Sequence, residues 1–292
     1  MIRALAVAAL ALAPPAVAAG ARLEPESRLV WSAPVPGFGG FSGIEVLEGG
    51  AALVAIGDQG TWVRAAMRRE GGRLVGIDLR DHGRLRAISG APLEGADADA
   101  EGLAVDAAGR FWVSFEGFHR VRRYDRIEGP ATDAPSHPDF RRLQNNSGLE
   151  ALAIDAGGVV HAIPERSGAW ERPFPVYRLR GGVWDRDLAL RRDGTFLVAG
   201  ADFGPDGKLY LLERDFRRFG GFATRVRRFT PGPEGFRAEE TLLETGFGST
   251  DNFEGISVWA DAAGVVRATL IADDNFFALQ STVVAEYRLV EG

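Results

Sequence analysis

Asp99-Ala-Glu101-Gly-Leu-Ala-Val-Asp-Ala-Ala-Gly109-Arg-Phe-Trp-Val-Ser-Phe-Glu116 is the stretch that decides the fold. Its apolar runs predict two short strands, at 102–105 and 110–115, and the turn residues Asp106-Ala-Ala-Gly109 separate them. One carboxylate precedes the first strand and another follows the second. The same unit recurs along the chain, so the sequence is organised as a repeat.

Four further copies of this unit can be aligned with the first. They occupy residues 41–58, 146–165, 196–213 and 251–274. The leading acids are Glu45, Glu101, Glu150 and Glu254, and the fourth copy enters near residue 200. The resulting period of roughly 50 residues, with several short strands in each period, is typical of a β-propeller. We therefore predict an all-β, propeller-like fold with five visible repeats, hence five or six blades.

Additional strands complete the predicted ring. A third strand with alternating apolar and charged residues follows the second acid of four repeats, at 62–67, 120–124, 175–179 and 225–229. We expect the arginines of these strands to form a solvated outer face. A strand at 28–32 is expected to complete the blade that ends with residues 283–289, so that both chain ends close the ring.

The first 19 residues have the composition of a secretory signal peptide. A single arginine precedes a short Ala/Leu/Val run, and small residues follow at 16–19. The run is interrupted by Pro14-Pro15 and is too short to span a membrane. We expect residues 20–292 to form one propeller domain that is periplasmic or secreted, with no membrane association after cleavage.

The composition excludes several classes of function. The formal net charge of −6 and the absence of a basic patch argue against nucleic-acid binding. Four scattered histidines, no cysteine and no H-E-x-x-H motif make a zinc site improbable. There is no G-x-S-x-G nucleophile elbow, no P-loop and no G-x-G-x-x-G. The expected partner is a small molecule, and we expect a monomer.

The repeated acids are the candidate functional residues. In a propeller the first strands line the central channel, so Glu45, Glu101, Glu150 and Glu254 are predicted to form an inner ring that binds metal or activates water. A second set of acids follows the second strands and is predicted to supply metal ligands or their supports: Asp58, Glu116, Glu165, Glu213, Asp273 and Asp274.

Carboxylates that converge in one funnel repel each other, so they require a cation, arginine partners or raised pKa values. An all-oxygen ligand set favours a hard divalent ion, and Ca²⁺ is the expected one. The alternative is structural, with the acids capping turns or pairing with arginines between blades. Arg166 and Arg214 each directly follow an acid, and they are candidates for binding phosphate only if the strand has already ended there.

Several of these motifs resemble a known family. Gly39-Gly-Phe-Ser-Gly-Ile-Glu45, Ala55-Ile-Gly-Asp58-Gln-Gly60, Asp99-Ala-Glu101-Gly-Leu, Gly148-Leu-Glu150-Ala-Leu and Asp206-Gly-Lys-Leu-Tyr-Leu-Leu-Glu213-Arg214-Asp215-Phe are similar to the phytase-like family labelled "esterase-like activity of phytase". The resemblance covers roughly residues 38–290. It implies an exported propeller-like protein rich in acidic residues, for which phosphoesterase activity has been proposed.

These observations lead to one favoured function and two alternatives. The favoured function is metal-assisted hydrolysis of a phosphorylated small molecule at a central acidic funnel. The first alternative is a non-catalytic propeller that binds a ligand around a structural ion. The second alternative is a lactone or ester hydrolase built on a similar ring.

Overall fold

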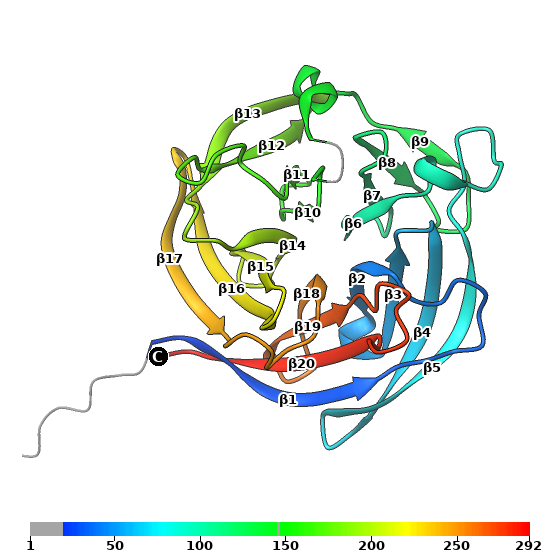
Figure 1. Cartoon of the computed structure of the whole chain (residues 1–292), viewed down its shortest axis with the longest axis vertical. Helices are drawn as coiled ribbons and strands as arrows, with labels where there is room; N and C mark the ends of the chain where they lie inside the picture. Colours follow the sequence, from blue (N-terminus) through cyan, green and yellow to red (C-terminus); the bar gives the residue numbers. More distant parts are fainter. Residues whose placement is uncertain (1–19, 145–146) are drawn as a thin grey trace, which may run out of the picture.

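Five antiparallel sheets of four strands each surround a common axis in the computed structural model, which describes residues 20–144 and 147–292 (Figure 1). The all-β propeller prediction is confirmed, and the described chain has five blades. The predicted signal peptide lies outside the described residues. No helix in the described ranges is long and apolar enough to cross a membrane.

Each blade runs outward from an inner strand. The first blade contains β2 (Phe41–Leu47), β3 (Ala52–Gly57), β4 (Thr61–Glu70) and β5 (Arg73–Arg84). The second contains β6 (Ala100–Val105), β7 (Phe111–Phe115), β8 (Arg120–Tyr124) and β9 (Ala131–Asp133). The third contains β10 (Ala151–Ile154), β11 (Val160–Ile163), β12 (Phe174–Arg180) and β13 (Val183–Leu190). The fourth contains β14 (Leu197–Phe203), β15 (Leu209–Arg217), β16 (Gly221–Gly232) and β17 (Gly235–Glu244).

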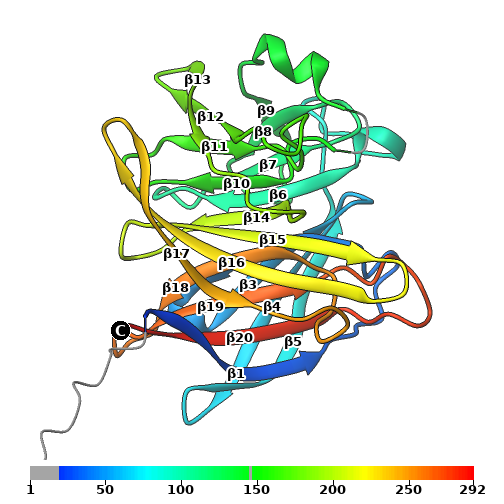
Figure 2. The same ribbon diagram turned by 60° about the vertical axis from the view of Figure 1, so that its left-hand side comes forward.

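The two ends of the chain share the fifth blade. It contains β18 (Phe253–Ala260), β19 (Val266–Ala272), β20 (Val283–Val290) and, at its outer edge, β1 (Arg22–Val30). β1 and β20 pair antiparallel from Arg22↔Val290 to Val30↔Val283, and they lie side by side in Figures 1 and 2. This arrangement confirms the predicted closure of the ring by the terminal strands.

A recurring aspartate fixes the turn between the first two strands of a blade. Asp106 accepts hydrogen bonds from the backbone N–H of Ala108 and Arg110, both at 3.0 Å. Gly109 closes the turn at φ +77°, a conformation that favours glycine. Asp155 and Asp261 accept bonds from the same relative positions at the corresponding turns of the third and fifth blades. In the fourth blade Gly204 occupies this place, and Asp206, two residues later, accepts the Lys208 N–H at 3.2 Å.

Hydrophobic cores lie between the blades, because each sheet must bury both of its faces. The five buried clusters each combine residues of two neighbouring blades. Ile56 of β3, for example, belongs to the same cluster as Leu103 of β6 and Val113 of β7. The blades are therefore held by face-to-face packing as well as by the closure of the ring.

The third strands lie where the sequence predicts them, but the expected solvated face is wrong for β16. Arg225, Arg227 and Arg228 are buried, with exposed fractions of 4%, 0% and 1%. Arg225 Nε and Arg227 Nη2 bind Glu213 at 2.8 and 2.6 Å, and the Glu213 side chain is fully buried. Long arginine side chains are here buried because carboxylates between the sheets neutralise them.

The axis of the ring is closed by glycines. One glycine stands at the same point of four inner strands: Gly43, Gly102, Gly200 and Gly255. A Cβ atom on Gly102 would lie 2.8 Å from Leu152 Cβ, and one on Gly200 would lie 2.7 Å from the Glu254 carbonyl oxygen. The cavity among these strands has a volume of about 10 Å³, so the glycine ring forms a floor rather than an open pore.

Candidate functional site

Three of the four predicted inner-ring acids occupy the same point of the repeat. Glu101 and Glu254 directly precede floor glycines, and Glu150 precedes Ala151 at the equivalent place in β10. The corresponding residues in the other two blades are Ser42 and Ala199. The prediction that Glu45 joins this ring is therefore wrong, because Glu45 follows Gly43 by two residues and lies on the opposite side of the floor.

Glu45 instead takes part in hydrogen bonds that link the inner strands of neighbouring blades. Ser257 Oγ donates to Glu45 Oε2 at 3.2 Å and accepts the Val46 N–H at 2.9 Å. Asp202, at the equivalent position of β14, accepts the Val258 N–H at 2.6 Å. Burial and then the charge of Asp202 raise the pKa of Glu45 well above its usual range. These bonds tie neighbouring blades together and give Glu45 a structural role.

The second set of acids superposes in four blades. The backbone N–H groups of its members donate to carbonyl oxygens at one common position of the inner edge, and these members are Asp58, Glu116, Glu165 and Asp273. In the fourth blade the equivalent residue is Arg214, which pairs with Leu197 in the β14–β15 register. The assignment of Glu213 to this set is wrong: β15 continues to Arg217, so alternation turns Glu213 to the buried face with Arg225 and Arg227.

Asp274 holds a loop rather than extending the second set. Its carboxylate accepts the N–H of Gly40 at 3.0 Å and of Phe276 at 3.1 Å, together with the Thr282 hydroxyl at 3.2 Å. These bonds link the connection between β19 and β20 to the entrance of the first blade. Asp274 contributes its negative charge to the site, because it raises the pKa of both Asp58 and Asp273.

We define the acidic funnel as eight carboxylates above the glycine floor: Asp58, Asp99, Glu101, Glu116, Glu150, Glu165, Glu254 and Asp273. Sequence reasoning missed Asp99. It stands two residues before Glu101, and the alternation of an extended chain places the two side chains on one side. That spacing was the signal that could have identified it.

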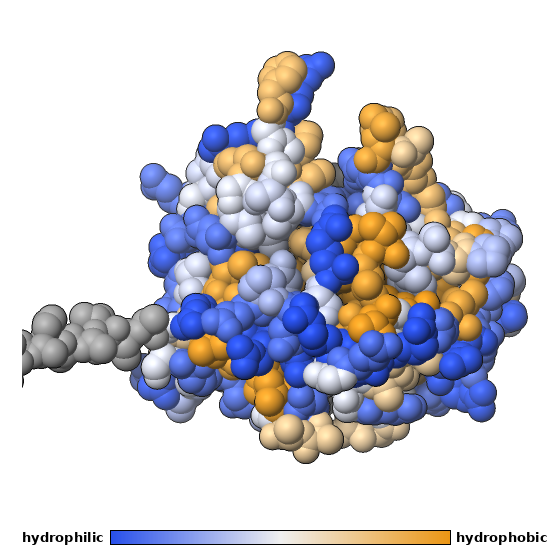
Figure 3. All heavy atoms as spheres, turned by 90° about the horizontal axis from the view of Figure 1, so that it is seen from below, coloured by the Kyte–Doolittle hydropathy of each residue, from blue (hydrophilic) through white to orange (hydrophobic). Residues whose placement is uncertain are grey.

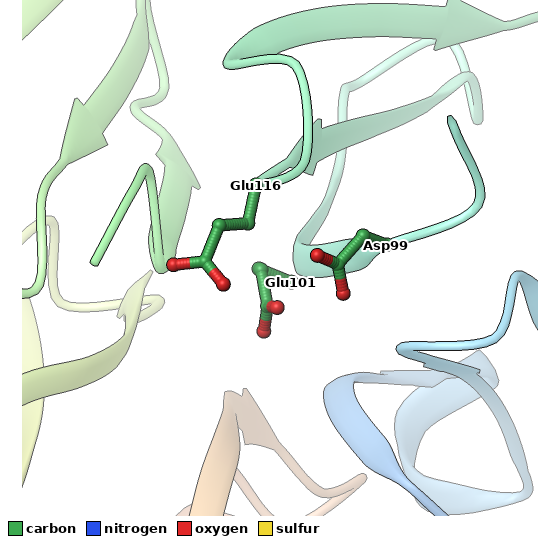
Figure 4. A group of neighbouring side chains, drawn as sticks. All are labelled: Asp99, Glu101 and Glu116. Carbon is green, nitrogen blue, oxygen red and sulfur yellow. The ribbon is translucent and has the colours of Figure 1, made fainter. Parts of the chain in front are cut away.

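Three funnel acids converge closely enough to share one ion. One carboxylate oxygen from each of Asp99, Glu101 and Glu116 lies within 4.8 Å of the other two. Figure 4 shows these three side chains pointing toward a common space. Glu116 also accepts the Gly148 N–H at 2.8 Å, which fixes its carboxylate between the second and third blades.

Burial and mutual repulsion raise the pKa values of several funnel carboxylates. Burial, and then the charges of Glu254, Asp99 and Glu116, raise the pKa of Glu101 well above its usual range. Burial and then the charge of Glu101 also raise the pKa of Glu150. Burial followed by neighbouring carboxylates raises the pKa of Asp58 to about 6 and that of Asp273 to about 7.

Arg214 supplies positive charge inside the funnel. Its Nη1 contacts the Glu254 carboxylate and Asn252 Oδ1, the latter at 3.0 Å, and its Nη2 lies 3.5 Å from Glu165 Oε1. Burial lowers the pKa of Arg214, but the surrounding carboxylates outweigh that effect and raise it overall. Arg214 is thus a fixed cation that pairs with two acids and offsets one unit of negative charge.

Arg166 has a different environment. It follows the end of β11, and its Nε donates to Ser147 Oγ at 2.8 Å and to Glu165 Oε2 at 3.0 Å. Its side chain is 46% exposed. Arg166 therefore stands at the edge of the funnel, on the side of the third blade.

Exposed apolar side chains gather beside the second strands of four blades, close in sequence to the second set of acids. The connections that follow the second strands of blades two to five carry exposed hydrophobic residues, and so does the end of β15, where Phe216 lies. The residues in the connections are Phe118, Trp170, Phe219, Phe276, Phe277 and Leu279. In Figure 3 two projections rise from the largely hydrophilic body, and hydrophobic residues gather on them. These apolar side chains can therefore contact an organic ligand.

The funnel residues fit a hard divalent cation. Eight carboxylates exceed the charge of Arg214, three of them already converge, and all the donors are oxygen. Ca²⁺ prefers six to eight oxygen ligands, which such a cluster and bound water can provide. Asp99, Glu101 and Glu116 are the residues best placed to hold it.

Comparison with solved structures shows the fold. The catalytic domain of a GH62 α-L-arabinofuranosidase from Coprinopsis cinerea aligns with a TM-score of 0.55 and 12% identity, over 94% of this chain and 99% of that one. An α-L-arabinofuranosidase from Podospora anserina in complex with cellotriose aligns with a TM-score of 0.53 and 12% identity, over 92% and 97%. At these identities the likeness is one of fold alone.

Comparison by sequence shows the family. No curated protein matches the chain. The phytase-like family, described as "Esterase-like activity of phytase", matches residues 36–276, which include all five inner strands and every acid of the funnel. The resemblance drawn from the short motifs is therefore confirmed, and the chain belongs to the phytase-like family.

Proposed function

We propose that the protein is an exported, divalent-cation-dependent hydrolase that cleaves a phosphoester of a small molecule in the acidic funnel. The observation that carries this proposal is the convergence of Asp99, Glu101 and Glu116 among five further carboxylates, with Arg214 as the opposing charge. Ca²⁺ is the proposed ion. When bound, such an ion supplies a Lewis acid that polarises a phosphoryl oxygen and makes water more acidic.

The chain's own residues divide into three roles. Asp99, Glu101 and Glu116 would hold the ion. Burial and the charge of Glu101 raise the pKa of Glu150, so this side chain holds a proton more readily than a free glutamate does and is the residue proposed to protonate a leaving oxygen. Arg214 fixes the carboxylates of Glu254 and Glu165 and so orients the wall of the funnel.

A specific observation favours a second candidate, hydrolysis of a lactone or carboxylic ester. Arg214 is already paired with Glu254 and Glu165, so it cannot act as an unpaired partner for a phosphate dianion. A neutral ester needs no such partner. A third possibility, a propeller that binds its ligand without turnover, uses the same ion and the same funnel.

We propose that the protein acts outside the cytoplasm. The leader-like composition of residues 1–19 supports export to the periplasm or the medium, and the absence of cysteine means that folding there needs no disulfide. We propose a monomer that acts on a small-molecule substrate, without nucleic acid or membrane as a partner. The acidic net charge supports this choice.

The first experiment is a thermal melt in EDTA, followed by melts with Ca²⁺, Mg²⁺ or Mn²⁺. An ion that binds only the folded state raises the melting temperature by mass action. Glu101→Gln should abolish the rise, whereas Glu70→Gln, an exposed control of the same chemistry, should preserve it. If no ion raises the melting temperature of the wild type, the metal-dependent proposal fails.

The second experiment separates the candidate reactions. With the effective ion present, 4-nitrophenyl phosphate, 4-nitrophenyl acetate and a sugar lactone are compared as substrates. Release of phosphate that is lost in Glu101→Gln supports the phosphoesterase. Cleavage of only the acetate or the lactone favours the second candidate, and no turnover with a retained ion response favours the binding protein.

A further inference from the structure

We infer that a pocket on the third blade, separate from the acidic funnel, binds an oxyanionic group of a small molecule. The pocket has a volume of about 610 Å³. Its walls come from the short helix η3 (Pro138–Arg142), the connection between β11 and β12, and the strand β13. The volume falls within the range of small-molecule sites, about 300 to 1,000 Å³.

The lining of the pocket is basic in an otherwise acidic protein. Four arginines line it, Arg142, Arg166, Arg172 and Arg186, against the two aspartates Asp139 and Asp187. This is a formal excess of two positive charges, whereas the whole chain has a net charge of −6. A concentration of guanidinium groups around a cavity is suited to phosphate or carboxylate, which it can bind through paired N–H donors.

Two of the four arginines, Arg142 and Arg172, are not paired with a carboxylate of the described residues. Arg186 Nη1 contacts the Asp139 carboxylate, so that pair is neutral. Arg142 and Arg172 are exposed, and neither side chain makes an ion pair or hydrogen bond with a residue in the described ranges. Scattered surface arginines are ordinarily solvated, but these two share one cavity with Arg166.

Arg166 connects the pocket to the funnel. Its Nε is held by Glu165, a funnel acid, and by Ser147. Its two terminal nitrogens have no hydrogen-bond partner among the described residues, and the side chain lines the pocket. An oxyanion bound there would lie next to the Glu165 edge of the funnel.

The loop that forms one wall is braced. Ser167 Oγ donates to the Ala169 carbonyl at 2.7 Å and accepts Arg192 Nη1 at 3.1 Å. The Arg192 guanidinium lies over the Trp170 ring at 4.6 Å. The cavity is therefore formed before a ligand arrives, which reduces the ordering cost of binding.

Binding of an oxyanion does not depend on catalysis in the funnel. Only the identity of the ligand rests on the proposed function: if the funnel cleaves an ester, the pocket anchors a second, non-reacting phosphate or carboxylate of the same substrate. The substrate class is then a small molecule that carries an acidic group beside the scissile bond.

The test is calorimetric titration with inorganic phosphate and, separately, with citrate. The protein is first stripped of ions with EDTA and dialysed into EDTA-free buffer, so that neither an ion in the funnel nor the chelator competes for either probe. We expect saturable binding of at least one probe to the wild type, weakened at least tenfold in the double variant R142A/R172A. Preference for phosphate or for citrate identifies the acidic group. The double variant R80A/R218A removes the same charge from exposed arginines elsewhere and should bind as the wild type does.

The outcomes separate this pocket from the funnel. Glu101→Gln should keep its affinity for the probe, even where it loses the response to the cation. Unchanged binding in R142A/R172A, equal loss in R80A/R218A, or no binding to the wild type would each overturn the inference. Melting temperatures of all variants verify that each is folded.

Discussion

Arg214 in the fourth blade and Glu116 in the second occupy the same position of the repeat and carry opposite charges. Glu116 N–H donates to the Asp99 carbonyl at 2.9 Å, and Arg214 stands opposite Leu197 at the equivalent pair. Four blades carry an acid at this position and the fourth blade carries Arg214, so the ring of acids contains one cation. The funnel can fold without every carboxylate being neutralised by protonation or by an ion.

Replacing this cation should destabilise the fold. In Arg214→Gln, the buried Glu254 loses its ionic partner and the buried Glu165 keeps only Arg166, and breaking a buried pair costs about 3–5 kcal/mol. The free energy of unfolding, measured with urea at pH 7.5 in EDTA, should fall accordingly. Arg166→Gln is the matched control: Arg166 is half-exposed and the buried Glu165 keeps Arg214, so the cost should be less than about 1 kcal/mol. Equal losses in the two variants would contradict the role of Arg214.

Glu213 should matter for stability and not for ion binding. Its carboxylate is fully buried between Arg225 and Arg227, so Glu213→Gln should lower the free energy of unfolding by about 3–5 kcal/mol. Glu244→Gln, an exposed acid 3.9 Å from Arg225, should have little effect. The rise in melting temperature on addition of Ca²⁺ should be the same in both variants. A reduced rise in Glu213→Gln alone would place Glu213 in the ion site after all.

Glu45 should contribute to the stability of the fold, through its hydrogen bond to the neighbouring blade, and not to ion binding. Glu45→Ala removes a buried acceptor for the Ser257 hydroxyl, and an unsatisfied buried group costs about 1–3 kcal/mol. The response to Ca²⁺ should persist because Glu45 lies beyond the glycine floor. The two quantities are read from urea unfolding and from thermal melts with and without the ion. Loss of the Ca²⁺ response with unchanged stability would instead return Glu45 to the inner ring.

Much of the fold was predictable because the repeat places strong signals on the inner strands. The Glu-Gly-Leu motif of residues 101–103 and the Asp106-to-Gly109 turn recur at a constant period, and they mark the first two strands of each blade. The outermost strands, such as β5 and β17, were missed. Few of their residues are buried, and their mixed polar composition does not distinguish them from loops.

The site was harder to predict than the fold because a carboxylate can occur at the wrong position of a repeat. An alignment of the acids makes Glu45 equivalent to Glu101. The equivalent residues are instead the glycines Gly43 and Gly102, because the inner strands approach too closely there for a side chain. Glu213 was misplaced for a related reason. Whether a strand ends before or after Arg214 decides which of the two neighbours faces the funnel, and composition alone does not reveal that boundary.

The raised pKa values of the buried acids predict an unusual dependence of stability on pH. Asp58, Asp273 and Asp202 have pKa values near 6, 7 and 7 in the folded protein, against about 3.9 for an unfolded aspartate. Between these values the folded state binds more protons than the unfolded state, so the free energy of unfolding decreases as pH rises. Stability in EDTA should therefore be higher at pH 5 than at pH 7.5.

Ca²⁺ should oppose this decrease, because an ion in the funnel favours ionised carboxylates there. Urea unfolding from pH 4.5 to 8, with EDTA and then with Ca²⁺, measures both slopes. Asp273→Asn should flatten the slope in EDTA, while Asp206→Asn, at an exposed turn, should leave it unchanged. A free energy of unfolding that rises with pH in EDTA would show that the funnel acids are already stabilised as carboxylates by the protein itself.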